Sequence, residues 1–326
     1  MLLIKGISEN AYFNLASEEY LADNFSEDIF YLWQNDNAVI IGKNQNAYSE
    51  IDLSYAEAHG IKVVRRLTGG GAVFHDNGNL NYTVIEKNDE ESFGNYEKFS
   101  KTVIAYLKTL GVDAELSGRN DLLADGKKIS GNAQCVRKGK IIHHGTLLFS
   151  SDLSRLSDVL RVNPLKLVDK GIKSVKSRVA NISDLTDKVN NITDFANGLY
   201  EYIKQNGEDV TEYAFTEEDV SKTEQLVKEK YGTREWNYGY ISDYGFKNSK
   251  KTAGGIVELE LSVEKGVVER IRISGDFFGK RDLSELEAMI VGTPHERAEI
   301  SKKLLLTDIS QYISGVSADE LLDIFF

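Results

Sequence analysis

Cysteine is almost absent from this sequence, and long apolar runs are missing altogether. One cysteine in 326 residues, Cys135, cannot form an intramolecular disulfide or a cysteine zinc cluster, so we expect a reducing compartment. No apolar run approaches the roughly 18 residues that a membrane helix needs. The first residues show no basic segment followed by a long apolar stretch, so no signal peptide is expected. We therefore expect a soluble cytoplasmic protein, most simply an enzyme.

The sequence also has fewer basic than acidic residues. Lysine and arginine number 39 against 51 aspartates and glutamates, which gives a net charge of −12. Proteins that bind duplex DNA are usually basic, so nucleic acid is not an expected partner. The composition, with 41% hydrophobic and 28% charged residues, excludes global disorder. The length of 326 residues suggests about two domains.

Strand-like and helix-like segments are mixed along the first two-thirds of the chain. Strands are predicted at residues 28–33, 38–42, 61–65, 80–85 and 140–149. One apolar face, which includes Phe99 and Val103, predicts a helix over residues 97–110, with Gly111 as its stop. A further helix is predicted over residues 151–160. The segments show no regular βαβ rhythm, which favours an α+β fold.

A smaller second domain is predicted at residues 246–326, after a first domain at residues 1–245. Residues 205–250 are interpreted as a junction, and the acidic stretch within them as the solvated surface of a helix. Residues 247–251 are the most polar part of the predicted connection. Two alternating segments around Glu264-Lys-Gly266 predict a hairpin. Helices are expected to follow at residues 283–291, 294–312 and 318–325.

Three consecutive glycines, Gly69 to Gly71, directly follow a predicted strand. Glycines reach backbone conformations closed to other residues, and their amide N–H groups can converge on an anion. Arg65 and Arg66 precede them, and arginine can bind a phosphate or a carboxylate in a bidentate way. A flexible turn would explain the glycines alone, but the arginines favour an anion site. The spacing matches neither a Walker loop nor the GxGxxG fingerprint.

Residues 119–140 carry six basic and two acidic side chains in an otherwise acidic protein. Such an excess can attract an anionic ligand. It can equally belong to a solvated hairpin with Asp125-Gly126 as its turn. The residues alone leave both interpretations open.

Several ordered motifs together resemble the lipoate–protein ligase family. They are Arg-Arg-Leu-Thr-Gly-Gly-Gly-Ala-Val-Phe-His-Asp at 65–76, Gly-Asn-Leu-Asn at 78–81, Gly-Arg-Asn-Asp at 118–121, Lys-Ile-Ser-Gly-Asn-Ala at 128–133, His-His-Gly-Thr-Leu-Leu at 143–148 and Gly-Ile-Lys-Ser-Val-Lys-Ser-Arg-Val at 171–179. The similarity runs from about residue 10 to residue 245, and the tail resembles the family's accessory domain. The resemblance implies a mixed-sheet catalytic domain of the biotin and lipoate ligase type, with a small α+β C-terminal domain.

The resemblance also implies a two-step reaction. The carboxylate of lipoate attacks the α-phosphorus of ATP, which gives lipoyl-AMP and pyrophosphate. A lysine amine on a lipoyl domain then displaces AMP. The implied cofactors are ATP and Mg²⁺, and the implied acceptors are the acyltransferase subunits of 2-oxoacid dehydrogenases and the glycine-cleavage H protein. The protein is expected to be a monomer, with no membrane partner.

The family pattern implies that Lys128 clamps both the phosphate and the lipoyl carbonyl oxygen. Neighbouring strand residues point to opposite faces, so only one of Lys127 and Lys128 should face a pocket, and the family register selects Lys128. Asp121 is the candidate magnesium ligand, with a plain turn residue as the alternative. The implied nucleotide-binding residues are Arg66, Gly70, Gly71, Ala72, Val73, Phe74, Asn120, Asp121 and Lys128.

Other residues suggest rival readings. His75, His143 and His144 have no carboxylate or cysteine cluster at ligand spacing, so structural roles are favoured over a metal site. Cys135 lies outside the position expected for the acyl-thioester cysteine of related acyltransferases, and we interpret it as a core residue. The alternative function is an ATP-independent transferase that moves octanoyl or lipoyl groups between carrier proteins. A third possibility is an inactive adenylate-binding module that senses lipoate.

Overall fold

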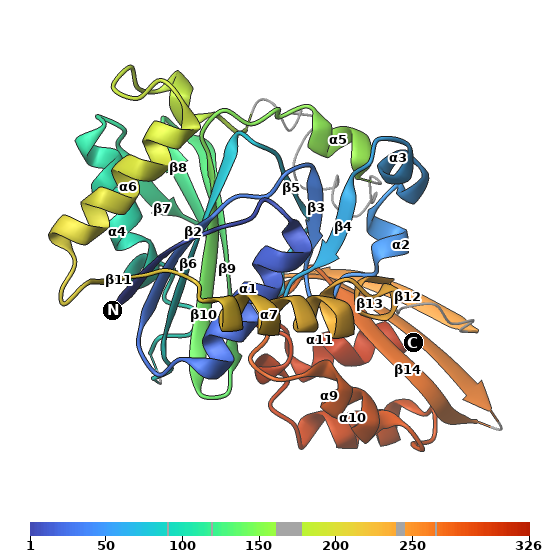
Figure 1. The fold of residues 1–326 in the computed structure, drawn as a ribbon. Helices are drawn as coiled ribbons and strands as arrows, with labels where there is room; N and C mark the ends of the chain where they lie inside the picture. Colours follow the sequence, from blue (N-terminus) through green and yellow to red (C-terminus); the bar gives the residue numbers. More distant parts are fainter. Residues whose placement is uncertain (90, 119, 161–177, 239–244, 265) are drawn as a thin grey trace.

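The computed structural model describes residues 1–89, 91–118, 120–160, 178–238, 245–264 and 266–326. Its largest feature is a mixed sheet with the strand order β11-β1-β2-β6-β10-β9-β8-β7 (Figure 1). These strands are β1 (Leu2–Lys5), β2 (Ile29–Trp33), β6 (Asn79–Lys87), β7 (Ala114–Ser117), β8 (Asp121–Ala124), β9 (Lys127–Arg137), β10 (Lys140–Leu148) and β11 (Thr211–Tyr213). Strand β1 runs parallel to β2 and β11, and the remaining neighbours are antiparallel. The predicted α+β class with a mixed sheet is confirmed.

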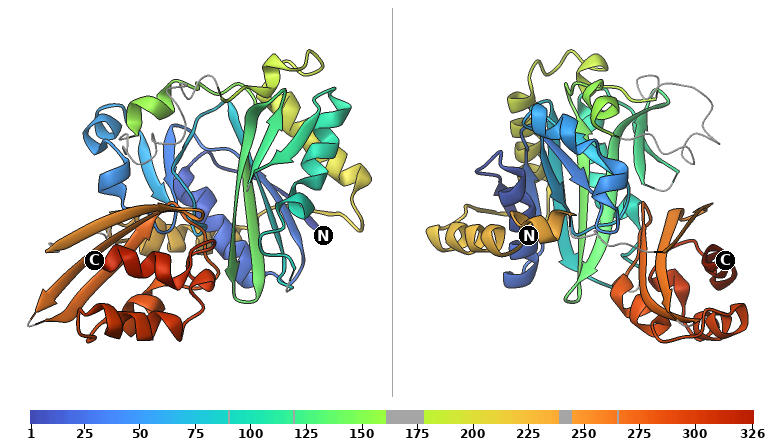
Figure 2. Two further views of the ribbon diagram at one scale, coloured as in Figure 1. Left: turned by 180° about the vertical axis from the view of Figure 1, so that it is seen from behind. Right: turned by 90° about the vertical axis from the view of Figure 1, so that its right-hand side faces the viewer.

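Two amphipathic helices, α4 (Tyr96–Thr109) and α6 (Ile192–Asn206), cover one face of this sheet (Figures 1 and 2). The apolar face predicted for residues 97–110 packs in the same core as Phe195 and Leu199 of α6. Gly111, with φ 83°, follows α4 as its predicted stop.

The opposite face of the large sheet is covered by α1 (Ala11–Asn24) and by a second, three-stranded sheet. This small sheet has the order β4-β3-β5, with β3 (Ala38–Ile41), β4 (Lys62–Arg65) and β5 (Val73–His75). Its residues alternate between two cores, since Ile40 packs with α1 whereas Val39 packs with α3 (Leu53–Ala58). The space between the two sheets is where the candidate site lies.

The segment interpreted as a junction belongs largely to the first domain. Strand β11 pairs with β1 at the edge of the large sheet. Helix α7 (Glu217–Leu226), which contains much of the acidic stretch, packs against α1, and Asp219 accepts a hydrogen bond of 2.7 Å from the hydroxyl of Tyr20. The shorter helix α8 (Arg234–Tyr238) follows. These tertiary contacts could not be read from the local acidic composition.

The C-terminal part is a three-stranded antiparallel sheet with its own apolar core and helices packed against it (Figure 2). Its elements are β12 (Phe246–Thr252), β13 (Gly255–Glu264), β14 (Val267–Gly275), α9 (Leu283–Ile290), α10 (Arg297–Leu305) and α11 (Ala318–Leu322). The predicted hairpin is confirmed as β13–β14, with Lys265 outside the described residues. The predicted polar connection at 247–251 is wrong, because these residues form the lysine-rich edge strand β12. The domain boundary after residue 245 stays a prediction.

Three of the predicted helices are shorter in the structure, and the helix predicted at 318–325 consists of α11 followed by a 3-10 turn at Asp323–Phe325. Residues 294–312 divide into α10 and a 3-10 turn at Ile309–Gln311, because the Asp308 side chain caps the new turn by accepting the N–H of Ser310. The predicted helix at 151–160 is reduced to α5 (Arg155–Val159). Within the part of the chain that the structure describes, none of the helices has the length and apolarity required to cross a membrane.

Candidate active site

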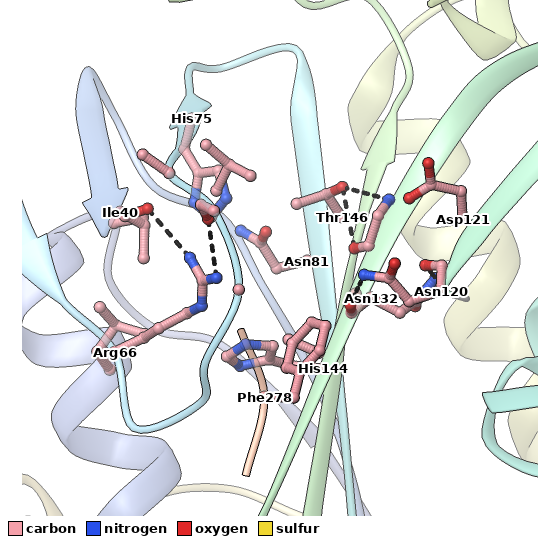
Figure 3. Close-up of a pocket in the computed structure, with 18 of the residues that line it drawn as sticks. Ile40, Arg66, His75, Asn81, Asn120, Asp121, Asn132, His144, Thr146 and Phe278 are labelled. Carbon is pink, nitrogen blue, oxygen red and sulfur yellow. Dashed lines mark hydrogen bonds between the residues drawn. The ribbon is translucent and has the colours of Figure 1, made fainter. Parts of the chain in front are cut away.

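A cavity of about 290 Å³ lies between the small sheet and the strands β9 and β10 (Figure 3). This volume is close to the lower limit of about 300 Å³ for small-molecule sites. It is lined by Leu15, Trp33, Ile40, Arg66, Gly70, Gly71, Ala72, Val73, His75, Asn81, Asn120, Asp121, Lys128, Gly131, Asn132, Ala133, His144, Gly145, Thr146 and Phe278.

The structure brings most of the predicted site residues to this one cavity, with Phe74 as the exception. Side chains alternate along β5, so Val73 and His75 line the cavity while Phe74 packs with Val39 in the core beyond the small sheet. Arg119 and residues 171–177 of the family-like motifs lie outside the described residues.

Lys128 and Asp121 form an ion pair in the cavity. Asp121 begins β8 and Lys128 stands near the start of the neighbouring strand β9, and Lys128 Nζ lies 2.7 Å from Asp121 Oδ1. Their side chains are 35% and 36% exposed, so water reaches both charges and a ligand can displace one from the other. Lys127 lines a different hollow, together with Asp152 and Asn181. The two adjacent lysines therefore line different cavities.

Two glycines in the family-like motifs make room for polar side chains in the cavity wall. A Cβ at Gly131 would lie 2.9 Å from Lys128 Nζ, closer than real Cβ contacts come. A Cβ at Gly145, on β10, would overlap Asn132 Oδ1. Asn132 Oδ1 instead accepts a hydrogen bond of 2.6 Å from the Tyr82 hydroxyl. Gly145 is therefore required by packing, whereas a Cβ at residue 131 would displace only the flexible end of the Lys128 side chain.

Arg66 holds the glycine loop through hydrogen bonds to its carbonyl oxygens. Its Nη2 donates to the carbonyl oxygens of Gly69 and Gly71 at 2.7 and 2.9 Å. A trans peptide holds each carbonyl opposite to the following N–H, so the N–H groups of Gly70 and Ala72 point away from Arg66. Burial lowers the pKa of Arg66 to about 10, which leaves the guanidinium charged at neutral pH. Arg66 thus fixes the orientation of the two peptide groups that follow Gly69 and Gly71.

Arg65 has a different role from the one its position in the motif suggests. Its side chain is 1% exposed, and its guanidinium donates to main-chain carbonyls of the first domain. The acceptors belong to Gly42, Lys43, Gln45, Trp236 and Asn237. The prediction that both arginines serve an anion site is therefore wrong for Arg65, which ties α8 to the end of β3.

The C-terminal part contributes directly to the cavity. The N–H of Gly70 donates to the carbonyl of Phe277 at 3.1 Å, and the ring of Phe278 lines the cavity. A second link is the ion pair of 2.8 Å between Lys43 Nζ and Asp282 Oδ2. No sequence signal identified Phe278, because a single aromatic residue in a separate domain has no distinguishing local pattern.

The structure separates the three histidines that the sequence analysis treated alike. His143 is buried, burial lowers its pKa well below the ordinary value, and its Nδ1 lies 3.0 Å from Gln134 Nε2. His75 and His144 instead line the cavity, and burial lowers the pKa of His75 to about 3. Among the described residues, no group of three or more histidine, cysteine, aspartate and glutamate side chains is arranged to hold a metal ion.

Cys135 packs at the margin of the core between α1 and the large sheet. Burial raises the pKa of its thiol to about 12. The reactive form of cysteine is the thiolate, which is scarce far below the pKa. Cys135 is therefore poorly suited to hold an acyl thioester.

Comparison with known families accounts for most of the chain. The family described as "Lipoyl protein ligase A/B catalytic domain" matches residues 10–204. The family described as "Bacterial lipoate protein ligase C-terminus" matches residues 242–325. The curated lipoate-protein ligase LplJ of Bacillus subtilis is 44% identical over 317 residues, which cover 96% of each chain.

Solved structures agree with these matches. The P. falciparum LipL1 structure in complex with lipoate has a TM-score of 0.81 and 26% identity, and the match covers 99% of this chain and 98% of that one. A bi-partite lipoate protein ligase with its E2 lipoyl domain, from Thermoplasma acidophilum, has a TM-score of 0.65 and 35% identity over 75% of this chain and 98% of that one. A lipoate-protein ligase A bound with ATP has a TM-score of 0.63 and 34% identity, over 74% and 98%.

Proposed function

The chain belongs to the lipoate–protein ligase family, and we propose that it activates lipoate with ATP and transfers the lipoyl group to a lysine of a lipoyl domain. In the first step a carboxylate oxygen bonds to the α-phosphorus while pyrophosphate leaves. In the second step the amine nitrogen bonds to the acyl carbon, the bond to AMP breaks, and the amine loses a proton.

The observation that carries this proposal is a charged lysine in the same cavity as the glycine loop. A carboxylate and a triphosphate repel each other, so a cation between them lowers the barrier as charge develops. Lys128 stands in the cavity wall, where its Nζ pairs with Asp121 Oδ1 at 2.7 Å. In the proposed reaction, Lys128 leaves that carboxylate and clamps the acyl oxygen and the phosphate.

The apolar wall formed by Leu15, Trp33 and Ile40 is proposed to hold the acyl chain and dithiolane ring of lipoate. Burial of apolar surface supplies most of the binding free energy for such a chain. The relative solved in complex with lipoate supports lipoate as the ligand of this proposal. Since small apolar differences change binding little, the wall discriminates weakly between lipoate and octanoate.

The glycine loop is proposed to hold the nucleotide. Gly71, Ala72 and Val73 line the cavity, and main-chain N–H groups such as that of Ala72 are suited to bind a phosphate oxygen. The relative solved with ATP supports nucleotide binding. In this proposal Arg66 acts by its charge and by the shape that it imposes on the loop, and Phe74 contributes its main chain only.

Mg²⁺ is proposed to accompany ATP. This ion commonly binds one or two carboxylates together with substrate phosphates, rather than a complete protein cage. Asp121 is the one carboxylate among the described residues that line the cavity, so it fits such a shared site. When bound with ATP, the ion would neutralise phosphate charge.

Lipoyl domains are the proposed acceptors, either those of 2-oxoacid dehydrogenase complexes or the glycine-cleavage H protein. The Thermoplasma acidophilum relative, solved with its E2 lipoyl domain, supports this class of partner. We further propose that the protein acts as a monomer in the cytoplasm, where its single cysteine would stay reduced.

The test is pyrophosphate release from ATP with lipoate, with and without a purified lipoyl domain, followed by intact-mass analysis of that domain. We expect release that depends on lipoate, and a lipoyl adduct that depends on ATP. Lipoylation from an octanoyl or lipoyl carrier protein without ATP would favour the transferase instead. Binding of lipoate and ATP without pyrophosphate release would favour a sensing module.

A further inference from the structure

Glu18 is a buried carboxylate to which the proposed reaction assigns no role. It lies on α1 and is 1% exposed. Its Oε1 accepts hydrogen bonds from Thr83 Oγ1 at 2.6 Å and from His144 Nδ1 at 2.8 Å. A buried charge is costly unless other groups compensate it, so this carboxylate requires an explanation.

A continuous chain of hydrogen bonds leads from Glu18 to the glycine loop. His144 Nε2 lies 2.8 Å from Thr68 Oγ1, and Thr68 Oγ1 lies 2.9 Å from Arg66 Nε. Arg66 and His144 both line the cavity (Figure 3). These hydrogen bonds therefore connect the Glu18 carboxylate to Arg66, the arginine that binds the carbonyl groups of the glycine loop.

The groups that can only donate, and the carboxylate that can only accept, indicate the direction of these hydrogen bonds. Arginine can only donate, so the Thr68 hydroxyl accepts from Arg66, and its own hydrogen is available to His144 Nε2. Because the Glu18 carboxylate can only accept, His144 Nδ1 is the donor in the hydrogen bond between them. At the other end, Trp33 Nε1 can only donate, and it does so to Thr83 Oγ1 at 2.8 Å. The Thr83 hydroxyl consequently donates to Glu18.

Charge complementarity supports the same connection. Burial lowers the pKa of Arg66, and the charge of Glu18 acts in the opposite direction. Removing one partner of a buried charge pair leaves the other uncompensated. The negative charge of Glu18 thus helps to keep the buried guanidinium of Arg66 charged.

We propose that Glu18, His144 and Thr68 form a positioning relay that holds Arg66, and through it the glycine loop, in the shape that binds ATP. The inference rests on the proposed function, since it concerns the nucleotide of that reaction. None of the three residues needs to touch ATP. His144 also lines the cavity, so the relay links the wall proposed for the acyl group to the loop proposed for the phosphates.

The relay predicts that ATP affinity depends on side chains behind the loop. Thr68→Val removes the hydroxyl that joins Arg66 to His144, and we expect the Kd for ATP to rise about tenfold or more. Thr68→Ser restores the hydroxyl and should recover most of the affinity. Glu18→Gln keeps an oxygen that can accept both hydrogen bonds but removes the charge, so it should show a smaller rise in Kd.

The experiment is calorimetric titration of the full-length protein with MgATP, without lipoate, alongside thermal denaturation of each variant. Ser17→Ala is the matched control, because Ser17 is a fully buried hydroxyl on α1 that donates to the carbonyl of Phe13 outside the relay. Its Kd should equal that of the unmodified protein.

The outcomes separate the relay from the proposed function. Absence of ATP binding by the unmodified protein would count against the proposed function. Normal binding there, with the same Kd in Thr68→Val, would overturn the relay, as would equal losses in Thr68→Ser and Thr68→Val. If Thr68→Val fails to fold, Glu18→Gln decides, and an unchanged Kd in that variant would overturn the relay.

Discussion

The side chain of Lys128 lies across Gly131, three positions further along β9. A Cβ at residue 131 would meet Lys128 Nζ at 2.9 Å and Lys128 Cε at 3.1 Å. The same Cβ position is 3.9 Å from Asp121 Oδ1. The absence of a Cβ at Gly131 therefore allows the observed position of Lys128 Nζ, and with it the ion pair with Asp121.

Gly131→Ala should move Lys128 without unfolding the protein. The end of a lysine side chain shifts easily, so we expect a thermal midpoint within a few degrees of the unmodified protein, but adenylation slower by about tenfold or more. Pyrophosphate release measures the rate. Gly245→Ala is the control, since a Cβ there meets nothing within 4 Å. A normal rate in Gly131→Ala would show that the observed lysine position is not the one used.

Lys128→Ala should abolish adenylation while the protein stays folded. Loss of one such stabilising group typically costs about 100- to 1000-fold in rate. Lys127→Ala is the matched control and should be nearly silent, because Lys127 lines another hollow. Single-turnover formation of lipoyl-AMP is the measurement. If the Lys127 variant proved inactive and the Lys128 variant active, the assignment of the strand faces would be reversed.

Gly70→Val and Gly71→Val should fail in different ways. Gly70 has φ 93°, and its Cβ would lie 2.9 Å from the Phe278 ring, so Gly70→Val should lose both stability and ligand binding. A Cβ at Gly71 meets nothing within 4 Å, but residue 71 lines the cavity. Gly71→Val should therefore keep its thermal midpoint and bind ATP and lipoate weakly. Unchanged calorimetric affinity in folded Gly71→Val would remove the loop from the binding site.

Truncation after about residue 245 should impair adenylation more than transfer from preformed lipoyl-AMP. The C-terminal part supplies Phe278 to the cavity and accepts the N–H of Gly70 through Phe277, so its removal alters the nucleotide loop. Both half-reactions are assayed in parallel, the second with synthetic lipoyl-AMP and a lipoyl domain.

Phe278→Ala in the full chain provides the companion test, because it alters the cavity wall and leaves the C-terminal core in place. We expect it to reduce adenylation selectively. Equal loss of both half-reactions on truncation would mean that the tail is needed only for folding. Full retention of adenylation would mean that the tail has no part in the first step.

Cys135 should be dispensable and slow to react. Since burial raises the pKa of its thiol to about 12, almost all of it is protonated at pH 8, so alkylation should be slow there and should keep rising with pH without a plateau near pH 9. Cys135→Ser should retain ligase activity within about twofold. Alkylation by iodoacetamide, followed by mass spectrometry, measures the first expectation. Loss of transfer in Cys135→Ser would revive the acyl-thioester mechanism.

Local patterns along the chain predicted the elements whose stability is largely local. The 97–110 helix and its stop at Gly111 follow from apolar spacing and from one left-handed residue. The hairpin of β13 and β14 follows from alternation around a tight turn. Strand β12 was missed because a polar edge strand carries little apolar alternation, and its partner strand supplies what its own sequence does not show.

Some features of the candidate site could likewise be predicted from local sequence, and others could not. The glycine loop and the segment around Lys128 were visible because each is a short run of unusual residues, and family resemblance added their roles. Arg65 and Arg66 are adjacent and chemically identical, yet one ties main-chain segments together and the other lines the cavity. Strand alternation at the end of β4 and the segments packed on each side decide between them.

The sequence by itself determined the family, the mixed α+β class and the short motifs, because these depend on residues that are neighbours in the chain. Only the tertiary structure decided that Phe278 lines the cavity, that Gly131 leaves room for the end of Lys128, and that buried Glu18 is connected to the glycine loop. Each of these contacts depends on strand register, on the seating of one domain against another, or on the orientation of a helix over a sheet. Those are set by the packing of the whole chain, since no local run of residues encodes which distant side chain it will meet.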